Sequence, residues 1–388
     1  MLNDTQARHC ARMQSLLVEQ IAAAGGWLSF ERYMDLALYA PGLGYYSAGA
    51  HKLGAGGDFT TAPEVSCLFG ACVARQCAEL LGALGGGSIL EIGAGSGRLA
   101  VDVLRRLDTL RRLPDSYWIL EVSADLRERQ RRRLEENLPD LIGRIRWLDQ
   151  PPELPFDGVI LANEVLDALP VARFRWSASG AEELGVVIAS ESAGARFAWE
   201  GRPARRTLAD SCRRLNLAGG GWDEGYVSEY CPSLAAWTET VTRALRTGAV
   251  LWFDYGLPRS QYYLPERHDG TLLCHFQHRA HDNPFLYPGL QDITAWVDFT
   301  SLAEASRPAG FALAGFTTQS YFLAGLKIDQ EMQVMAGDDA NRFARLANEA
   351  RQLMLPGEMG ERFKAMAWLR GLDLPLSGFA LQDLRHTL

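Results

Sequence analysis

A glycine-rich segment between an apolar run and a helical pattern carries the strongest chemical signal in the chain. Residues 91–97 read EIGAGSG and follow directly on the apolar run that starts at Ser88. Alternate glycines let a backbone turn tightly and approach a ligand, and a following helix N-terminus favours negative groups. A dinucleotide site requires G-x-G-x-x-G/A, whereas Arg98 stands at the sixth position here. The spacing therefore favours S-adenosylmethionine (SAM) over a dinucleotide, with a purely structural turn as the third interpretation. The predicted cofactor contacts are Glu91, Gly93, Gly95 and Gly97.

Two further acids could hold the remainder of SAM. Glu121 ends a second apolar run, 117–120, and a carboxylate there can accept hydrogen bonds from both ribose hydroxyls. Asp149 follows a third run, 145–148, and could accept a hydrogen bond from the adenine amino group. The alternatives are a solvated acid at a strand end for Glu121 and an ordinary loop acid before Pro151 for Asp149.

The segment after the fourth apolar run, 158–162, is the expected substrate side. It reads NEVLDALP over residues 163–170, and substrates meet cofactors at this end of an open parallel sheet. Asn163 fits the first position of the [DNS]-P-P-[FYW] motif of nucleic-acid amino-methylating enzymes, but Glu164 and Val165 do not fit its prolines, so we reject that function. Asn163 remains a predicted cofactor contact.

Glu164 and Asp167 favour a cationic substrate. SAM carries a sulfonium, and a guanidinium ~4 Å away in a partly desolvated site would be repelled by several kcal/mol. Carboxylates offset that repulsion and orient a guanidinium through paired hydrogen bonds. We therefore predict Glu164 as the first guanidinium ligand and Asp167 as the second. A helix-start acid is the plain alternative for Asp167.

Other polar residues are weaker candidates. Asp58, Phe59 and Thr60 lie in a loop that could close over SAM, with Asp58 facing its charge; a structural turn is the alternative. His275, His278 and His281 are spaced by three, but the surrounding proline and aromatics suggest a loop, so we predict no metal site. His278 is kept as a hydrogen-bonding residue of the substrate pocket. Glu229 is a further candidate acid, for which a solvated surface position is the alternative.

The elements that must position these residues follow from periodicity. Residues 88–164 alternate β-α-β-α-β-β, which predicts a doubly wound parallel sheet, an α/β fold. Helices are expected over 1–25 and 29–39, and a capping box at Thr61–Glu64 is expected to open a helix that runs to about Leu84. Short antiparallel strands are expected over 171–200. Further expected elements are helices over 233–246, 299–307 and 340–353, and strands over 248–253, 311–317 and 363–368.

Length and composition indicate the number of domains, the kind of partner and the cellular compartment. A chain of 388 residues predicts two domains, or one with large insertions. A net charge of −8 makes duplex nucleic acid a poor partner. The seven cysteines include no C-x-x-C pair, which indicates a reducing compartment. No apolar run of ~18 residues and no signal-peptide pattern is evident, so we expect no membrane span and a cytoplasmic protein, or the mature part of an organellar one.

Several motifs in order resemble the MidA family of SAM-dependent methyltransferases. The matching segments are 39–46, 57–64, 91–97, 121–123, 162–164, 167–170, 254–256, 270–272, 288–289, 292–295 and 297–299. Trp296 is a departure, because many relatives are expected to have histidine there. The resemblance implies a class I methyltransferase core (86–170, 247–256 and 308–388) with an N-terminal helical cap (1–85) and α+β substrate-binding insertions (171–246 and 257–307).

The same resemblance implies methylation of an arginine in a protein partner. For the mitochondrial members of the family, which are located in the matrix, that partner is a respiratory complex I subunit. Two other hypotheses stay open from the residues alone. One is a SAM-dependent methyltransferase of a small molecule, which a closed apolar pocket would favour. The other is an assembly chaperone that binds SAM without turnover.

Overall fold

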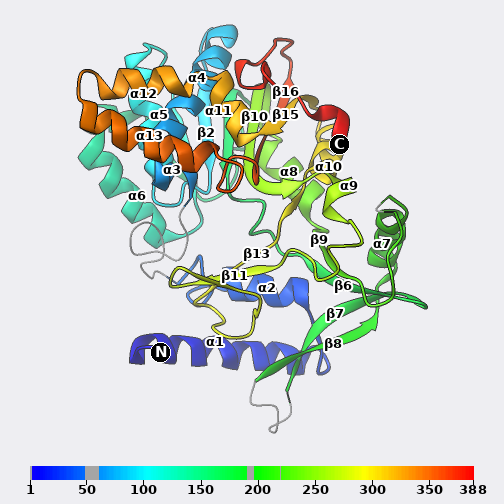
Figure 1. Cartoon of the computed structure of the whole chain (residues 1–388). Coiled ribbons are helices and arrows are strands. Elements are labelled where there is room, and N and C mark those ends of the chain that lie inside the picture. The colour runs from blue at the N-terminus through cyan, green and yellow to red at the C-terminus, as the bar shows by residue number, and fades with distance from the viewer. Residues whose placement is uncertain (1, 49–60, 190–195, 219) are drawn as a thin grey trace.

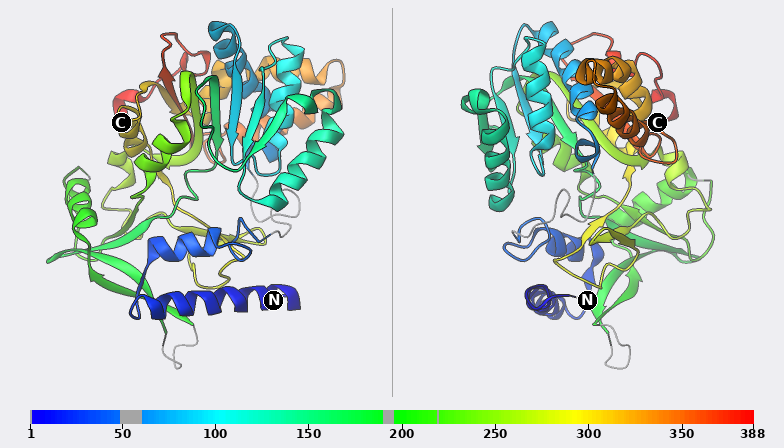
Figure 2. Two further views of the ribbon diagram at one scale, coloured as in Figure 1. Left: turned by 180° about the vertical axis from the view of Figure 1, so that it is seen from behind. Right: turned by 60° about the vertical axis from the view of Figure 1, so that its left-hand side comes forward.

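The computed structural model has two lobes (Figure 1). It describes residues 2–48, 61–189, 196–218 and 220–388. The larger lobe is a sheet with helices on both faces. The smaller lobe, which holds the N-terminal helices and two antiparallel sheets, lies below the larger one in the views of Figures 1 and 2.

The sheet of the larger lobe runs β15-β16-β10-β5-β2-β3-β4, and β14 pairs with β10. Its strands are β2 (Ser88–Ile92), β3 (Tyr117–Leu120), β4 (Ile145–Leu148), β5 (Phe156–Asn163), β10 (Leu245–Leu257), β14 (Val297–Asp298), β15 (Ala312–Thr318) and β16 (Phe363–Arg370). From β10 to β4 all neighbours on this path are parallel. The chain moves outward in one direction through β3 and β4 and in the other through β5 and β10. Ligands bind at such a reversal, outside the carboxyl ends of the strands.

Apolar residues alternate between the two faces of these strands. Ile89 and Leu251 belong to one buried cluster, and their neighbours Leu90 and Trp252 belong to the other. The first cluster is covered by α4 (Cys67–Leu84), α5 (Arg98–Thr109), α6 (Ala124–Asn137), α11 (Gln319–Gly325), α12 (Ile328–Ala336) and α13 (Ala340–Met354). The second is covered by α8 (Leu234–Thr242) and α10 (Phe299–Ser306). This packing confirms the class I methyltransferase fold expected from the alternation over 88–164.

The smaller lobe combines three distant parts of the chain. It contains α1 (Asp4–Ala23), β1 (Leu28–Ser29), α2 (Phe30–Tyr39), β6 (Ala172–Ser177), β7 (Gly180–Ile188), β8 (Phe197–Pro203), α7 (Arg206–Ala218), β9 (Val227–Tyr230), β11 (Leu273–Phe276), β12 (Arg279–His281) and β13 (Asp292–Thr294). The short helix α9 (Arg259–Tyr262) lies between this lobe and α10, to which Arg259 bonds. β1 pairs with β7, and one buried cluster joins residues from α1 and α2 with residues from β7, β11 and β13. The N-terminal helices and parts of both predicted insertions therefore share a core, whereas α8 and α10, which also belong to the predicted insertions, pack on the core sheet.

The segment 62–84 does not form the single helix of the N-terminal cap that the sequence predicted. We expected it to be one helix of the N-terminal cap, but α3 (Ala62–Val65) and α4 are separate and pack on the core sheet. Thr61 makes no side-chain cap, whereas Ser66 is extended and accepts a hydrogen bond from Leu68 N, which starts α4. We therefore propose that the methyltransferase core begins at residue 62 rather than 86.

α4 is also long and apolar enough to cross a bilayer, with a mean hydropathy of 1.4 over 18 residues, and among the described residues it is the one such helix. Because 61% of it is buried inside the protein, it is better explained as a core helix.

Candidate functional site

A cavity of about 890 Å³ lies between the two lobes. Its larger-lobe wall comes from the segments that follow β2, β3 and β5, where the strand order reverses. Its smaller-lobe wall comes from α2, the residues after it and the start of β13. The cavity therefore joins the predicted cofactor loop to the predicted substrate loop in a single space.

The glycine loop adopts a backbone that L side chains disfavour. Gly93, Gly95 and Gly97 have φ of 64°, 54° and 80°, all in the left-handed region. Gly93 and Gly95 line the cavity, but Gly97 does not. A Cβ at Gly97 would lie 3.4 Å from Gln130 Cα, so this glycine serves the packing of α5 against α6 rather than a ligand contact. The G-x-G-x-G spacing thus meets three backbone requirements, two of them in the cavity.

Glu121 directly follows β3 and has a fixed carboxylate. It is 6% exposed, and its two oxygens accept hydrogen bonds from Ser123 N (2.9 Å) and Gln130 Nε2 (3.1 Å). Each oxygen keeps a second lone pair, which a ribose hydroxyl could use. Burial raises the pKa of Glu121 from its ordinary value, and the two donors oppose that shift.

Two residues beside Glu121 complete this side of the cavity. Val122 also lines it, and at 68% exposure it offers an apolar surface to an adenine ring. Asp149 lines the cavity too, but its side chain is 70% exposed and forms an ion pair with Arg127. Its proposed contact with the adenine amino group stays a prediction.

Glu91 lies buried beneath the glycine loop. Its Oε2 accepts a hydrogen bond of 2.7 Å from the Tyr117 hydroxyl, and burial raises its pKa to about 7. It lines the cavity, so it could accept a hydrogen bond from the amino group of SAM. Asn163, at the end of β5, also lines the cavity, and its Oδ1 is buried without a hydrogen-bond partner in the described part of the chain.

Glu164 is held in an unusual conformation. Its φ is 52°, and its backbone N–H donates to Phe253 O at 2.8 Å. Oε1 accepts from Ala62 N (3.3 Å) and Asn163 Nδ2 (3.2 Å), whereas Oε2 is buried with no hydrogen-bond partner among the described residues. Burial, reinforced by the negative charge of Asp167, raises the pKa of Glu164 to about 8.

Asp167, like Glu164, has one carboxylate oxygen that accepts a hydrogen bond and one that has no hydrogen-bond partner among the described residues. Its Oδ2 accepts a hydrogen bond from the Tyr255 hydroxyl, and Oδ1 is buried without a partner in the residues that the structure covers. Burial raises its pKa to about 6. Buried polar atoms are nearly always paired in proteins. Both residues line the cavity, and each keeps one buried oxygen that could accept a further hydrogen bond if the side chain turned toward a ligand.

Two stacked tyrosines of the smaller lobe face the cavity, and one of them bonds to this loop. Tyr39 and Tyr46 stack with ring centroids 5.6 Å apart, and both line the cavity. Tyr39 donates from its hydroxyl to Ala168 O at 2.9 Å, and Tyr46 donates to Asp292 Oδ1 at 3.0 Å. The substrate half of the cavity therefore has an aromatic wall beside its acids.

Some predicted site residues lie elsewhere. His278 is exposed at the turn between β11 and β12, with φ of 60°, and does not line the cavity. Its proposed catalytic role has no support from this position, because the histidine-rich segment folds into a hairpin that turns the side chain away to the surface. Asp58, Phe59 and Thr60 lie outside the described residues.

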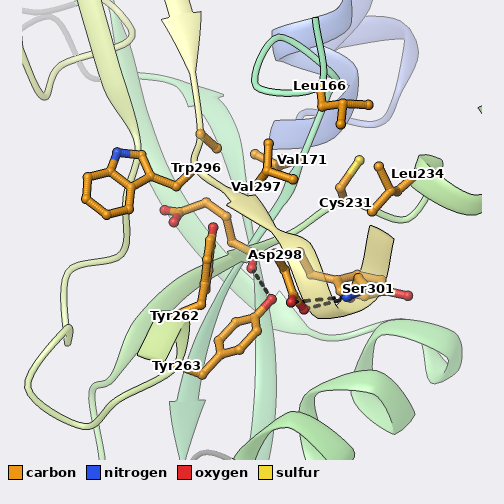
Figure 3. A pocket seen from close by; sticks show the side chains of 13 residues that line it. Leu166, Val171, Cys231, Leu234, Tyr262, Tyr263, Trp296, Val297, Asp298 and Ser301 are labelled. Carbon is orange, nitrogen blue, oxygen red and sulfur yellow. Dashed lines mark hydrogen bonds between the residues drawn. The ribbon is translucent and has the colours of Figure 1, made fainter. Parts of the chain in front are cut away.

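Glu229 is buried, but in a different place. It lines a small cavity of about 30 Å³, drawn in Figure 3, beside Trp296 and Tyr262. This volume is enough for about one water molecule. The carboxylate accepts from Thr271 N at 2.7 Å and lies 3.4 Å from Arg173 Nε, so it joins two segments of the smaller lobe. It is neither the solvated acid nor the substrate ligand that we considered.

Other residues of the site could not be recognised from the sequence. Tyr39, Tyr46, Asp254, Tyr255 and Asp292 all line or support the cavity, and all lie in segments noted only for their resemblance. Val122 gave no signal. A usable clue was the Asp254-Tyr255 pair near the carboxyl end of β10, because the carboxyl ends of adjacent parallel strands meet at one edge of a sheet.

A doubly wound sheet, a glycine loop at its reversal point and an acid at the end of the next strand define the class of SAM-dependent methyltransferases. Residues 72–317 match the model of a family of S-adenosyl-L-methionine-dependent methyltransferases, to which this chain belongs. The resemblance predicted from the motifs is thereby confirmed.

Curated relatives align along most of the chain. The zebrafish (Danio rerio) protein named "Protein arginine methyltransferase NDUFAF7, mitochondrial" is 32% identical over 90% of this chain and 84% of its own length. The human (Homo sapiens) protein of the same name is 29% identical over 89% of this chain and 80% of its own length.

Two solved structures from Burkholderia thailandensis share the whole fold. One, a methyltransferase-like protein bound to S-adenosyl-homocysteine (SAH), has a TM-score of 0.95 and 44% identity, covering 100% of this chain and 99% of its own. The other, a native structure from the same superfamily, has a TM-score of 0.92 and 43% identity with the same coverage.

We expect Glu121→Ala to weaken SAM binding by about 1.5–3 kcal/mol, or roughly 10- to 150-fold, since hydrogen bonds to a charged group are worth this much. Calorimetry with SAM measures the change. Glu128→Ala is the control, because it removes the same charge from an exposed position on α6. Equal affinities for the two folded variants would show that Glu121 does not bind the ribose.

Proposed function

We propose that this methyltransferase modifies an arginine side chain of a protein partner. The observation that supports the proposal is the pair of buried carboxylates, Glu164 and Asp167, each with one oxygen that lacks a hydrogen-bond partner in the described chain. Both line the same cavity as the glycine loop. A guanidinium presents five N–H donors in a planar fork and suits two carboxylates better than an ammonium does.

The chemistry follows from this placement. SAM supplies a methyl group on a sulfonium centre. A guanidinium nitrogen attacks the methyl carbon in line, the carbon–sulfur bond breaks, and its electron pair stays on sulfur. The attacking nitrogen must then lose a proton, so that the methylated guanidinium keeps a single positive charge. Glu164 can accept this proton, since its pKa of about 8 lies close to neutral pH.

The two acids also oppose charge repulsion. A guanidinium beside a sulfonium in a buried site is destabilised, and two carboxylates reduce that cost. Tyr39 and Tyr46 offer ring surface to the flat guanidinium or its alkyl stem. The protein therefore contributes orientation and charge compensation, and the proximity of the two reactants lowers the barrier.

A protein partner is supported by the curated relatives, which are named protein arginine methyltransferases. The resemblance to mitochondrial members points to a respiratory complex I subunit as the specific partner. The relatives are mitochondrial by name; the cytoplasmic location expected for this chain stays a prediction.

Labelling tests the proposal. Purified enzyme and isotope-labelled SAM are added to an extract of the source organism that lacks the gene, and Glu164→Gln protein serves as the control. We expect mass spectrometry to find methylarginine in one or a few proteins with the parent enzyme only. Label confined to small molecules would overturn the arginine proposal in favour of a small-molecule methyltransferase. If the protein binds SAH but transfers no methyl group to any partner, the result would instead favour an assembly chaperone that binds SAM without turnover.

A further inference from the structure

We propose that Asp254 and Tyr255, at the carboxyl end of β10, are positioning residues that hold Glu164 and Asp167 ready to bind the substrate cation. This inference rests on the proposed function for the identity of that cation. The positioning itself is a property of the loop and applies to any substrate that the two acids receive.

Asp254 holds the backbone of the acidic loop. Its Oδ2 accepts hydrogen bonds from three successive N–H groups, those of Val165 (3.2 Å), Leu166 (2.9 Å) and Asp167 (3.3 Å). Its Oδ1 accepts from Tyr255 N at 2.9 Å. One fully buried carboxylate therefore anchors the three residues that follow Glu164.

This anchoring explains the strained backbone of Glu164. A non-glycine residue in the left-handed region costs of order 1–3 kcal/mol and persists only where its surroundings impose it. At Glu164 the surroundings are the hydrogen bond of its N–H to Phe253 O and the Asp254 carboxylate just beyond. The end of β10 thus sets the direction in which the Glu164 side chain leaves the loop.

Tyr255 acts on the second acid. Its hydroxyl donates to Asp167 Oδ2, so one oxygen of that carboxylate is fixed and the other is left for a ligand. The tyrosine is itself buried and packs edge-on against Phe363 of β16, with ring centroids 5.4 Å apart. The hydroxyl therefore has little freedom to follow a displaced carboxylate.

The titratable groups around Asp167 come from several elements. Asp254 and Tyr255 face it from β10, and Glu164 lies on its own loop. Tyr39 of α2 and Tyr46 are also close. Asp292 of β13 faces Glu164. Burial raises the pKa of Asp167, and the Tyr255 hydrogen bond opposes that rise by stabilising the carboxylate. Without the hydroxyl, the pKa should rise further and the ionised form should require a higher pH.

Tyr255→Phe tests this step directly. The full-length protein is labelled with carbon-13 at its aspartate carboxyls and bound to SAH. Carbon NMR then follows the titration of Asp167, whose signal is identified by its absence in Asp167→Asn. We expect its midpoint to rise by about one to two pH units, the equivalent of one hydrogen bond to a charged group.

Tyr33→Phe is the matched control, because this buried hydroxyl donates to Pro284 O at 2.8 Å, away from the acids. We expect no change in the midpoint. An unchanged Asp167 midpoint in Tyr255→Phe would overturn the proposal for this residue. The NMR titration needs no substrate, so its result stands even if the substrate is not arginine. The labelling experiment tests the arginine proposal by itself.

Asp254→Asn tests the backbone anchor. An asparagine side chain has one acceptor oxygen and one NH2 group. Its NH2 group, which cannot accept a hydrogen bond, must therefore face either the three loop N–H groups or Tyr255 N. We expect kcat to fall at least tenfold while SAH affinity stays within twofold. Asp298→Asn is the control, since Asp298 also accepts from two backbone N–H groups, Thr300 (3.0 Å) and Ser301 (3.2 Å), outside the main cavity. Equal kcat losses in the two variants would overturn the anchor. If Asp254→Asn does not fold, Asp254→Glu, which keeps the carboxylate but displaces it by one methylene from the loop N–H groups, takes its place with the same expected result.

Discussion

Glu164→Gln should lose methyl transfer by roughly two orders of magnitude or more while binding SAM almost as well as the parent protein. Glutamine keeps the size of the side chain and one acceptor oxygen, so the contacts of Oε1 with Ala62 N and Asn163 Nδ2 can persist. The charge and the proton acceptor are lost, and general-base and positioning effects in enzymes are of this size. Turnover on the identified partner and SAM affinity are measured on one preparation.

A matched control for this change is Glu229→Gln. It also neutralises a buried carboxylate, but one that pairs with Arg173 outside the main cavity. We expect this variant to unfold more easily and, while folded, to transfer methyl groups at the parent rate. Near-normal turnover of Glu164→Gln would mean that Glu164 is not the guanidinium ligand and would leave Asp167 as the remaining candidate.

Gly95→Val should reduce SAM affinity by roughly two orders of magnitude or more. Gly95 lines the cavity with φ of 54°, a conformation that a β-branched residue reaches only under strain of order 1–3 kcal/mol. The added side chain would also occupy space next to the ligand. The backbone strain destabilises the free and the SAM-bound protein alike, so the loss of affinity comes from the added side chain, and two orders of magnitude correspond to about 2.7 kcal/mol of lost contact. Calorimetry with SAM gives the affinity, and circular dichroism establishes that the variant is folded.

The control for Gly95→Val is Gly25→Val. Gly25 follows α1 with φ of 76°, and a Cβ there would meet nothing within 4 Å. It therefore suffers comparable backbone strain far from the cavity, and its SAM affinity should equal that of the parent. A folded Gly95→Val protein with unaltered affinity would refute cofactor binding at the glycine loop.

The cofactor half of the site could be predicted because its signals are local in sequence. The glycine loop lies between a strand and a helix whose periodicities are clear, and Glu121 follows the next strand directly. Ser123, two residues further on, caps α6. Where a candidate site depends on one β-α turn, the residue types and spacing of that turn are enough to predict where it lies.

The substrate half depends on contacts between distant segments, and it was predicted less completely. Tyr39 and Asp254 are separated by most of the chain, and nothing local in either segment indicates that both adjoin the acidic loop. His278 shows the opposite error, because a regular histidine spacing suggested a pocket residue where the chain forms an exposed turn. Helices α7, α11 and α12 were missed as well, and the predicted helix over 233–246 ends at Thr242, where β10 follows closely.

The strand order has a consequence for how the chain folds during synthesis. Residues 88–163 supply four adjacent strands early, but the open edge of β5 is covered only when β10 emerges, and β10 stays open on its other side until β16, residues 363–370, is made. Pairings of such long sequence separation form slowly, and an uncovered apolar strand edge is a template for aggregation. Folding yield, more than the stability of the finished protein, is therefore the property most sensitive to changes along β10 and β16.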